Sequence, residues 1–259
     1  MKNIALITGA SGGIGAALAT EHAKRGGDLI LVARSANKLQ ERQASLKKQY
    51  QVKVKVIALD LSKTEAAQEL YEQVQAANLQ VNFLINNAGF GDYGLFQETD
   101  WQKEAQMIDL NMKSLTHLTK LFLPDMVRRK KGYIMNVAST AAFQPGPLMA
   151  VYFATKHYVL AFSEAIANEV KESGVRVTAL CPGPTASGFQ EAASMENSRL
   201  VSNKKLPASA EVAAYGYRAM LKGKPVAIHG TMNGLMARGV GFLPRQMVVN
   251  MVRRLQERA

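Results

Sequence analysis

The sequence predicts an α/β fold of the Rossmann type, a doubly wound parallel sheet of about seven strands with helices on both of its faces. Short runs of apolar, often β-branched residues alternate along the chain with longer segments of helical periodicity. The runs are almost continuously apolar, as is typical of parallel strands that are buried on both sides. A glycine-rich turn follows the first run directly and opens the first helical segment, which indicates the start of a right-handed βαβ unit.

Each expected element is a stretch of one periodicity. The strands are expected at Ile4–Thr8, Leu29–Ala33, Val54–Leu59, Phe83–Asn86, Tyr133–Ala138, Val175–Cys181 and Val226–His229. The helices are expected at Ile14–Arg25, Ala36–Gln49, Lys63–Ala77, Trp101–Arg129 and Val151–Ser173. We expect two helices within 101–129, with a break at Pro124. No repeat or linker interrupts this order, so we expect a single domain over 1–259, with a coenzyme-binding half (1–90), a catalytic and substrate-binding half (91–229) and a basic amphipathic C-terminal extension (230–259).

The composition is that of a globular protein, and the cysteine count fits a reducing compartment. The chain has 259 residues, of which 47% are hydrophobic and 20% charged, an ordinary balance for a domain with a sizeable core. No apolar run approaches the roughly 18 residues that span a bilayer, and the first run breaks at Gly9, too early for a secretory signal. Cys181 is the one cysteine, so an intramolecular disulfide is impossible. We therefore expect a cytoplasmic protein.

The net charge of +12 raises the alternative of a nucleic-acid-binding protein. Such proteins tend to gather their cations on one face with aromatic residues between them, whereas most cations here are scattered and Trp101 is the one tryptophan. We expect that the charge is either solvated surface or draws acidic small molecules, without nucleic acid as a partner. No metal is expected, because the four histidines lack the grouping of a metal site; they are His22, His117, His157 and His229.

The glycine-rich turn predicts a dinucleotide site. Glycines let the chain turn sharply and bring backbone N–H groups close to a pyrophosphate, which the dipole of the following helix also favours. The spacing departs from the strict G-x-G-x-x-G form, and no Gly-Lys-Ser/Thr follows as it does in a P-loop. A merely structural turn is the alternative. The expected coenzyme contacts here are Thr8, Gly9, Ser11, Gly12, Gly13, Ile14 and Gly15.

The end of the second expected strand favours NADP(H) over NAD(H). An NAD site usually places an acidic residue there to hold the ribose hydroxyls, but this chain has Arg34 and Ser35. A guanidinium can pair with both oxygens of a 2′-phosphate, and the serine hydroxyl can donate a further hydrogen bond. An exposed surface cation is the alternative for Arg34.

Tyr152, Lys156 and Ser139 are candidates for carbonyl chemistry. Tyr152 and Lys156 share one face of an expected helix at positions i and i+4, so the ammonium is expected to lower the pKa of the phenol. A phenol tuned in this way can protonate an alkoxide as it forms. Ser139 follows a strand end, where its hydroxyl can bind a substrate oxygen or simply cap the next turn.

With these motifs in this order, the chain resembles the classical short-chain dehydrogenase/reductase family, in its broad-specificity NADP-type subgroup, along nearly its whole length. The segment Thr8–Gly15 is similar to the family's coenzyme turn, and Arg34 to its NADP-type specificity residue. The remaining coenzyme contacts implied by the resemblance are Asp60 and Leu61 at the adenine, Asn87, Ala88 and Gly89 near the adenosine ribose, and Pro182, Gly183 and Thr185 on the nicotinamide side. Asn111, Ser139, Tyr152 and Lys156 resemble the family's catalytic tetrad.

The resemblance implies an oxidoreductase that passes hydride between NADPH and a ketone or aldehyde, or runs the reverse reaction with an alcohol. Tyr152 would donate the proton, and Ser139 would orient the carbonyl oxygen. Lys156 would hold the nicotinamide ribose, so that Tyr152 and Lys156 also contact the coenzyme, and Asn111 would anchor a water that replenishes the proton. The family usually forms homodimers or homotetramers. A non-catalytic NADPH-binding sensor or scaffold is the alternative function.

A hydrophobic or fatty-acyl carbonyl compound is the expected substrate class, because aromatic and methionine residues surround the expected site. They could equally be ordinary core packing. The candidate pocket walls are Phe90, Tyr93, Phe96, Phe143, Met149 and Phe189, followed by an expected lid over 190–207.

The C-terminal extension carries an amphipathic helix that starts at Pro244, with an apolar stripe and several arginines. Such an element can lie on an anionic membrane surface. We favour the alternative, in which it packs on its own domain or on a neighbouring subunit.

Overall fold

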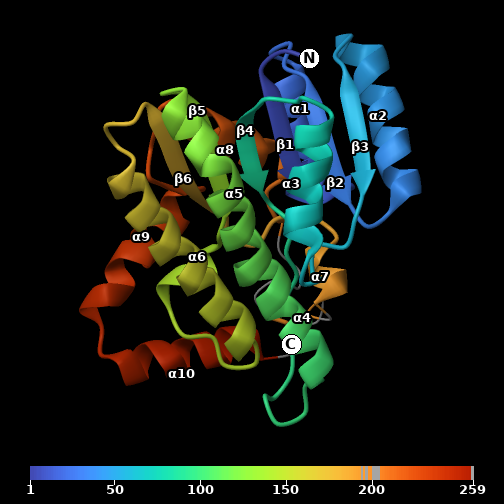
Figure 1. Ribbon diagram of the computed structural model, residues 1–259. Helices are drawn as coiled ribbons and strands as arrows, with labels where there is room; N and C mark the ends of the chain where they lie inside the picture. Colours follow the sequence, from blue (N-terminus) through green and yellow to red (C-terminus); the bar gives the residue numbers. More distant parts are fainter. Residues whose placement is uncertain (194, 196–197, 200–204, 258–259) are drawn as a thin grey trace.

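The computed structural model describes residues 1–193, 195, 198–199 and 205–257. Its centre is a parallel sheet of seven strands in the order β3-β2-β1-β4-β5-β6-β7 (Figure 1). Because the order reverses at the neighbours β1 and β4, a crevice is expected outside their carboxyl ends. The fold is therefore the predicted doubly wound sheet. The strands are β1 (Ile4–Thr8), β2 (Leu29–Ala33), β3 (Val54–Ala58), β4 (Val81–Asn86), β5 (Gly132–Val137), β6 (Val175–Cys181) and β7 (Val226–Ile228).

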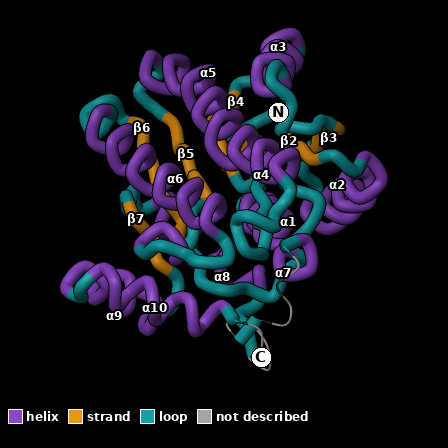
Figure 2. The backbone as a smooth tube through the Cα atoms, turned by 90° about the horizontal axis from the view of Figure 1, so that it is seen from below, coloured by secondary structure: helices purple, strands orange, loops and turns teal. Residues whose placement is uncertain are grey.

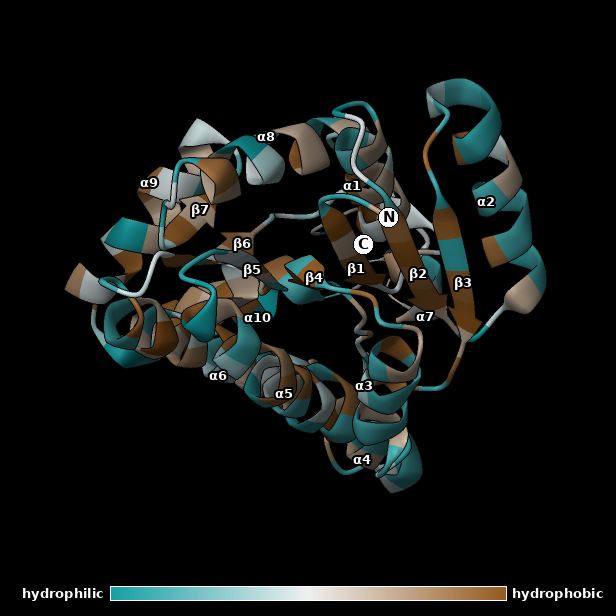
Figure 3. Cartoon of the chain, turned by 45° about the horizontal axis from the view of Figure 1, so that its top comes forward, coloured by the Kyte–Doolittle hydropathy of each residue, from teal (hydrophilic) through white to brown (hydrophobic). Residues whose placement is uncertain are grey.

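Helices cover both faces of the sheet, because successive strand residues point to opposite sides. In β1, Ala5 and Ile7 face a core shared with α1, α2 and α8, whereas Ile4 and Leu6 face a core shared with α3 and α5. Figures 2 and 3 show the two layers. The α-helices are α1 (Gly13–Ala23), α2 (Ala36–Tyr50), α3 (Ala66–Ala76), α4 (Trp101–Ile108), α5 (Leu115–Arg128), α6 (Ala150–Glu169), α7 (Phe189–Ala192), α8 (Ser209–Leu221), α9 (Thr231–Gly239) and α10 (Arg245–Gln256).

The stretch 101–129 holds two α-helices, as expected, but the expected break at Pro124 is wrong. Pro124 lies inside α5 on an exposed side, and the helix continues to Arg128. The division falls instead at η1 (Asp109–Ser114), a turn of π-helix between α4 and α5. Helix α8, which no expected element covered, packs along α1 on one face of the sheet.

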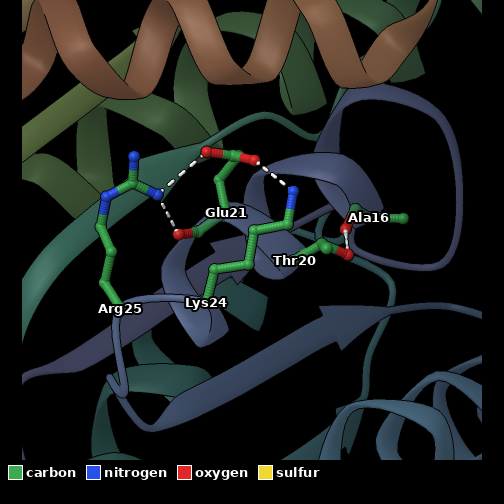
Figure 4. A network of polar contacts seen from close by, with 5 residues as sticks. All are labelled: Ala16, Thr20, Glu21, Lys24 and Arg25. Carbon is green, nitrogen blue, oxygen red and sulfur yellow. Dashed lines mark hydrogen bonds and ion pairs between the residues drawn. The ribbon is translucent and has the colours of Figure 1, made fainter. Parts of the chain in front are cut away.

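A buried carboxylate fixes the end of α1 (Figure 4). Glu21 accepts hydrogen bonds of 2.9 Å from Lys24 Nζ and from Arg25, and the Arg25 guanidinium lies 4.5 Å from the centre of the Tyr217 ring on α8. Burial raises the pKa of Glu21, but these two cations outweigh it and hold the pKa below its ordinary value. The network ties α1, whose other end carries the glycine-rich turn, to α8.

Candidate active site

The structure brings the predicted site residues to one edge of the sheet. They follow the carboxyl ends of β1 to β6 or lie on η1 and α6, which pass that edge. In an open parallel sheet this is the edge at which ligands bind.

The glycine-rich turn leaves the start of α1 open. Gly9 and Gly13 have φ angles of +66° and +53°, a region that side chains disfavour. A Cβ atom on Gly15 would lie 2.3 Å from the Gly9 carbonyl oxygen, whereas one on Gly12 would meet nothing within 4 Å. No side chain caps the helix at Gly12, so backbone N–H groups of its first turn remain available to an anion. The turn therefore has the donors and the open space that a pyrophosphate needs.

Thr8 joins the first coenzyme segment to the one after β4. Its Oγ1 accepts hydrogen bonds from the backbone N–H groups of Asn87 (3.0 Å) and Ala88 (2.9 Å). The Asn87 side chain donates in return to the Thr8 carbonyl oxygen at 2.9 Å. These bonds hold the carboxyl ends of β1 and β4 together beside the crevice.

Arg34 stands exposed directly after β2. Asp60 lies after β3, near Arg34. Burial raises the pKa of the Asp60 carboxyl, but hydrogen bonds from Ser62 and the charges of Arg34 and Lys63 outweigh burial and hold that pKa below its ordinary value. Ser35 accepts a hydrogen bond from the Lys38 N–H (3.4 Å) and so caps α2, while its own O–H stays free to donate. Leu61 is buried beside them. An exposed guanidinium and a hydroxyl, with no acid at the end of β2, fit a 2′-phosphate.

Tyr152 and Lys156 lie one turn apart on α6, both buried, with Lys156 Nζ 5.7 Å from the centre of the Tyr152 ring. The expected lowering of the phenol pKa by Lys156 is wrong in this structure. Burial raises the pKa of Tyr152 to about 12, and only a hydrogen bond with Ser139 opposes it. Lys156 donates to the Val137 carbonyl oxygen at 2.8 Å, and burial lowers its own pKa to about 8. Desolvation is therefore the main cause of the pKa shifts of both residues.

Asn111 sits on the π-helical turn η1 and is 1% exposed. Its amide donates to the Phe90 carbonyl oxygen (3.0 Å) and to Thr155 Oγ1 (3.1 Å), and its Oδ1 accepts from the Phe90 N–H (3.2 Å). A Cβ atom on Gly89 would lie 2.8 Å from Asn111 Oδ1 and 3.5 Å from Lys156 Nζ, so Gly89, Asn111 and Lys156 are neighbours. Such π-helical turns occur frequently at functional sites.

Ser139 caps the next turn, which is one of the two roles considered for it; its binding of a substrate oxygen stays a prediction. Its Oγ accepts from the Ala141 N–H at 3.1 Å and so caps the short helix η2 (Thr140–Phe143). The same hydroxyl lies 3.4 Å from the Pro182 carbonyl oxygen and is bonded to Tyr152. Thr185 is buried, and its Oγ1 donates to the Gly183 carbonyl oxygen (2.8 Å), so this loop is folded on itself beside the tetrad.

Four of the six candidate pocket walls gather in one apolar cluster around Tyr152: Phe90, Tyr93, Met149 and Phe189. Phe143 packs instead in a second cluster with α6 and β6, and Phe96 is 65% exposed, because it lies on the loop before α4. A Cβ atom on Gly91 would lie 2.9 Å from Phe189 and 3.2 Å from Tyr152, so little space separates this loop from the site. Part of the expected lid, 194, 196–197 and 200–204, lies outside the described residues.

Two features of the site escaped sequence reasoning. Thr155, between Tyr152 and Lys156, donates to the Tyr152 carbonyl oxygen (2.7 Å) and accepts from Asn111. Helix α10 adds Val248 and Val252 to the apolar cluster around Tyr152. The sequence offered a signal for Thr155, because a threonine stands beside the Tyr–Lys pair. It offered no signal that the C-terminal helix would reach the cluster around Tyr152.

Comparison with known proteins gives one family. The sequence pattern of the short chain dehydrogenase family matches residues 3–198. Very-long-chain 3-oxoacyl-CoA reductases from Anas platyrhynchos and Rattus norvegicus are 36% and 34% identical, over 69% of this chain and 58% of each relative, so the chain spans less than two thirds of their length. A solved short-chain dehydrogenase from Sphingobium yanoikuyae in complex with NADPH is 29% identical, with a TM-score of 0.83 over 92% of this chain and 93% of that one.

Proposed function

Because the chain belongs to the short-chain dehydrogenase family, we propose that it is an NADP(H)-dependent oxidoreductase that interconverts a ketone or aldehyde and its alcohol. The membership confirms the family expected from the motifs. One observation carries the proposal: Tyr152, Lys156 and Asn111 are buried together at the carboxyl edge of the sheet, and Ser139, which is half-buried, makes a hydrogen bond with Tyr152. A scaffold protein would not need these polar groups out of water, because burying them costs free energy.

The residues of the crevice fit NADP(H). The uncapped start of α1 would hold the pyrophosphate, Arg34 and Ser35 the 2′-phosphate, and Asp60, Leu61 and Asn87–Gly89 the adenosine. Tyr152, Lys156 and the loop from Pro182 to Thr185 would contact the nicotinamide end. When bound, NADPH supplies the hydride for carbonyl reduction.

The protein's own residues would donate the proton to the substrate and replace it afterwards. Tyr152 would donate its phenolic hydrogen to the carbonyl oxygen, and Ser139, already bonded to the phenol, would hold that oxygen in place. Lys156 would stabilise the tyrosinate that remains, because an ammonium next to a phenolate favours the charged form. Asn111, fixed by Phe90 and Thr155, would connect Lys156 to a water that returns the proton.

A hydrophobic, fatty-acyl-type carbonyl compound is the substrate class we propose. The cluster around Tyr152 offers apolar walls on the side where a substrate would lie. The relatives named above are 3-oxoacyl-CoA reductases of very long chains, which supports an acyl substrate. We further propose a cytoplasmic homodimer or homotetramer.

A substrate panel tests the proposal. The purified protein would be mixed with NADPH or NADH and with carbonyl compounds graded in size and polarity, including 3-oxoacyl thioesters of increasing chain length, and coenzyme absorbance followed. We expect turnover with NADPH, highest for long apolar chains. Tight NADPH binding without turnover of any compound would instead support a sensor or scaffold.

A further inference from the structure

The C-terminal segment exposes an apolar surface. Of the thirteen large apolar side chains that are exposed in the described part of the chain, eight lie within 232–255, and Phe242 is 90% exposed. Exposed apolar side chains concentrated in one segment in this way indicate an interaction site. We call this surface the C-terminal face; its residues are Met232, Leu235, Met236, Phe242, Leu243, Met247, Met251 and Leu255.

Helix α10 packs against its own domain through one stripe of residues, so the helix is held in place while its other sides face outward. Val248, Val252 and Gln256, spaced four apart, are buried on one stripe. The Tyr93 hydroxyl donates to the Gln256 carbonyl oxygen (2.6 Å), and Gln256 Nε2 donates to the Pro147 carbonyl oxygen (3.1 Å). The sequence analysis favoured packing of this helix on its own domain or on a neighbouring subunit, and the first of these is what the structure shows.

The next stripe of α10 has no such cover. Met247, Met251 and Leu255 follow the same spacing of four and are 56%, 42% and 42% exposed. Figures 1 and 2 show α9 and α10 at the outside of the molecule. The described helices include none that is both long and apolar enough to cross a bilayer.

The two helices of the C-terminal face, α9 and α10, also carry exposed positive charge. Arg238, Arg245 and Arg254 are exposed, and none of the three forms an ion pair with a described residue. Within 230–257 the single acid is Glu257, which Arg253 approaches at 3.6 Å and Arg199 at 3.9 Å. The face therefore combines methionine, leucine and phenylalanine side chains with unneutralised guanidinium groups.

We propose that the C-terminal face binds the surface of an anionic lipid bilayer. Apolar side chains would enter the boundary between headgroups and acyl chains, while the arginines pair with lipid phosphates. A second copy of the chain fits less well, because a symmetric dimer would join two copies of a segment whose single acid within 230–257, Glu257, already has arginine partners, so its exposed arginines would find no carboxylate across the interface. The proposal is independent of the enzymatic one, since lipid binding needs neither coenzyme nor substrate.

Vesicle sedimentation tests the proposal. Full-length protein would be spun with vesicles of phosphatidylcholine alone or mixed with phosphatidylglycerol, at low and at physiological salt. We expect binding to the mixed vesicles that weakens as salt rises, because salt screens the arginines. Absence of binding to the mixed vesicles at low salt overturns the proposal.

Two variants and a matched control locate the binding surface. Arg245→Glu/Arg254→Glu should lower binding roughly tenfold or more, and Met247→Ser/Met251→Ser/Leu255→Ser should also lower it. Lys47→Glu/Lys48→Glu, which makes the same change in net charge at exposed positions of α2, should bind nearly as the wild type. Thermal unfolding of each variant checks that it folds.

Two results would contradict the proposal even if the wild type binds vesicles. The first is an equal loss in both charge variants, which would make total charge the cause. The second is a triple serine variant that binds lipid normally but changes from dimer to monomer in sedimentation velocity, which would make the C-terminal face a subunit interface.

Discussion

Lys156 Nζ donates its hydrogen bond to the Val137 carbonyl oxygen, 2.8 Å away, although Tyr152 lies one helical turn before it on the same helix. The ammonium is thus held by the end of β5 and sits 5.7 Å from the centre of the tyrosine ring. Burial therefore governs both pKa values, raising that of Tyr152 and lowering that of Lys156. At neutral pH the phenol therefore keeps its proton until a developing charge is present to receive it, while Lys156 is still largely an ammonium.

Removing the phenolic oxygen should abolish turnover and spare coenzyme binding. In Tyr152→Phe the ring stays in its apolar cluster, so the fold is kept, but the general acid is lost; we expect kcat to fall by about a hundredfold to ten-thousandfold. Steady-state rates and NADPH fluorescence titration measure the two effects. Tyr158→Phe on the same helix, which loses only a bond to Thr116, is the matched control. Activity above about a tenth of wild type in Tyr152→Phe would rule out the acid role.

Reversing the charge after β2 should reverse coenzyme preference. Arg34→Asp replaces an exposed guanidinium by a carboxylate that repels a 2′-phosphate and can accept from ribose hydroxyls. We expect kcat/KM with NADPH to fall at least about tenfold, while that with NADH is kept or rises. Lys48→Asp, also exposed but further along α2, should leave the ratio unchanged. An unchanged ratio in Arg34→Asp would remove this residue from the 2′-phosphate.

Stability should depend on pH through Lys156. Its pKa is about 8 when folded and 10.5 in the ordinary state, so between these values the unfolded chain binds more protons and the free energy of unfolding rises with pH. We expect the wild type to gain roughly 2 kcal/mol over Lys156→Met between about pH 8 and about pH 10. Tyr152 acts in the opposite sense only above its ordinary value of 10.0, since its folded pKa is about 12. Urea unfolding at a series of pH values tests this; parallel curves for the two proteins would contradict it.

A methyl group on Gly91 should narrow the substrate pocket without unfolding the protein. The added Cβ would lie 2.9 Å from Phe189 Cζ and 3.1 Å from Met149 Cε, the ends of side chains that can move. We expect Gly91→Ala to raise KM several-fold, and more for long acyl chains than for short ones. Gly94→Ala, whose Cβ would meet only Thr99 Cγ2 at 3.1 Å, serves as the control. A uniform loss of kcat with every substrate would place Gly91 outside the pocket.

The sequence predicted the sheet well, because each strand is a short apolar run buried on both faces and each functional motif follows a strand end. Strand ends differed by only one or two residues; the fourth strand, for example, begins at Val81 rather than Phe83. Helix α8 escaped because its small residues, such as Ala213 and Gly216, suit close packing on the sheet but give a weak helical pattern.

Sequence patterns could not predict how deeply individual side chains are buried. The spacing of Tyr152 and Lys156 indicated a charged pair, yet the depth of burial decides their pKa values and depends on contacts far along the chain. The same holds for α10, whose inner stripe reaches the cluster of Tyr152 from the other end of the sequence. Amphipathicity alone could not divide its apolar residues between an inner and an outer stripe.

The number of residues in the π-helical turn at Asp109–Ser114 sets how α4 is rotated relative to α5. An α-helix advances about 100° per residue, so deleting one residue from this turn would restore regular winding and swing α4 about a quarter-turn around its axis relative to α5. Met107 would then leave its apolar neighbours, and Asn111 would lose the backbone of Phe90. Losing one residue from η1 should therefore disturb the site more than exchanging most of the side chains that the turn carries.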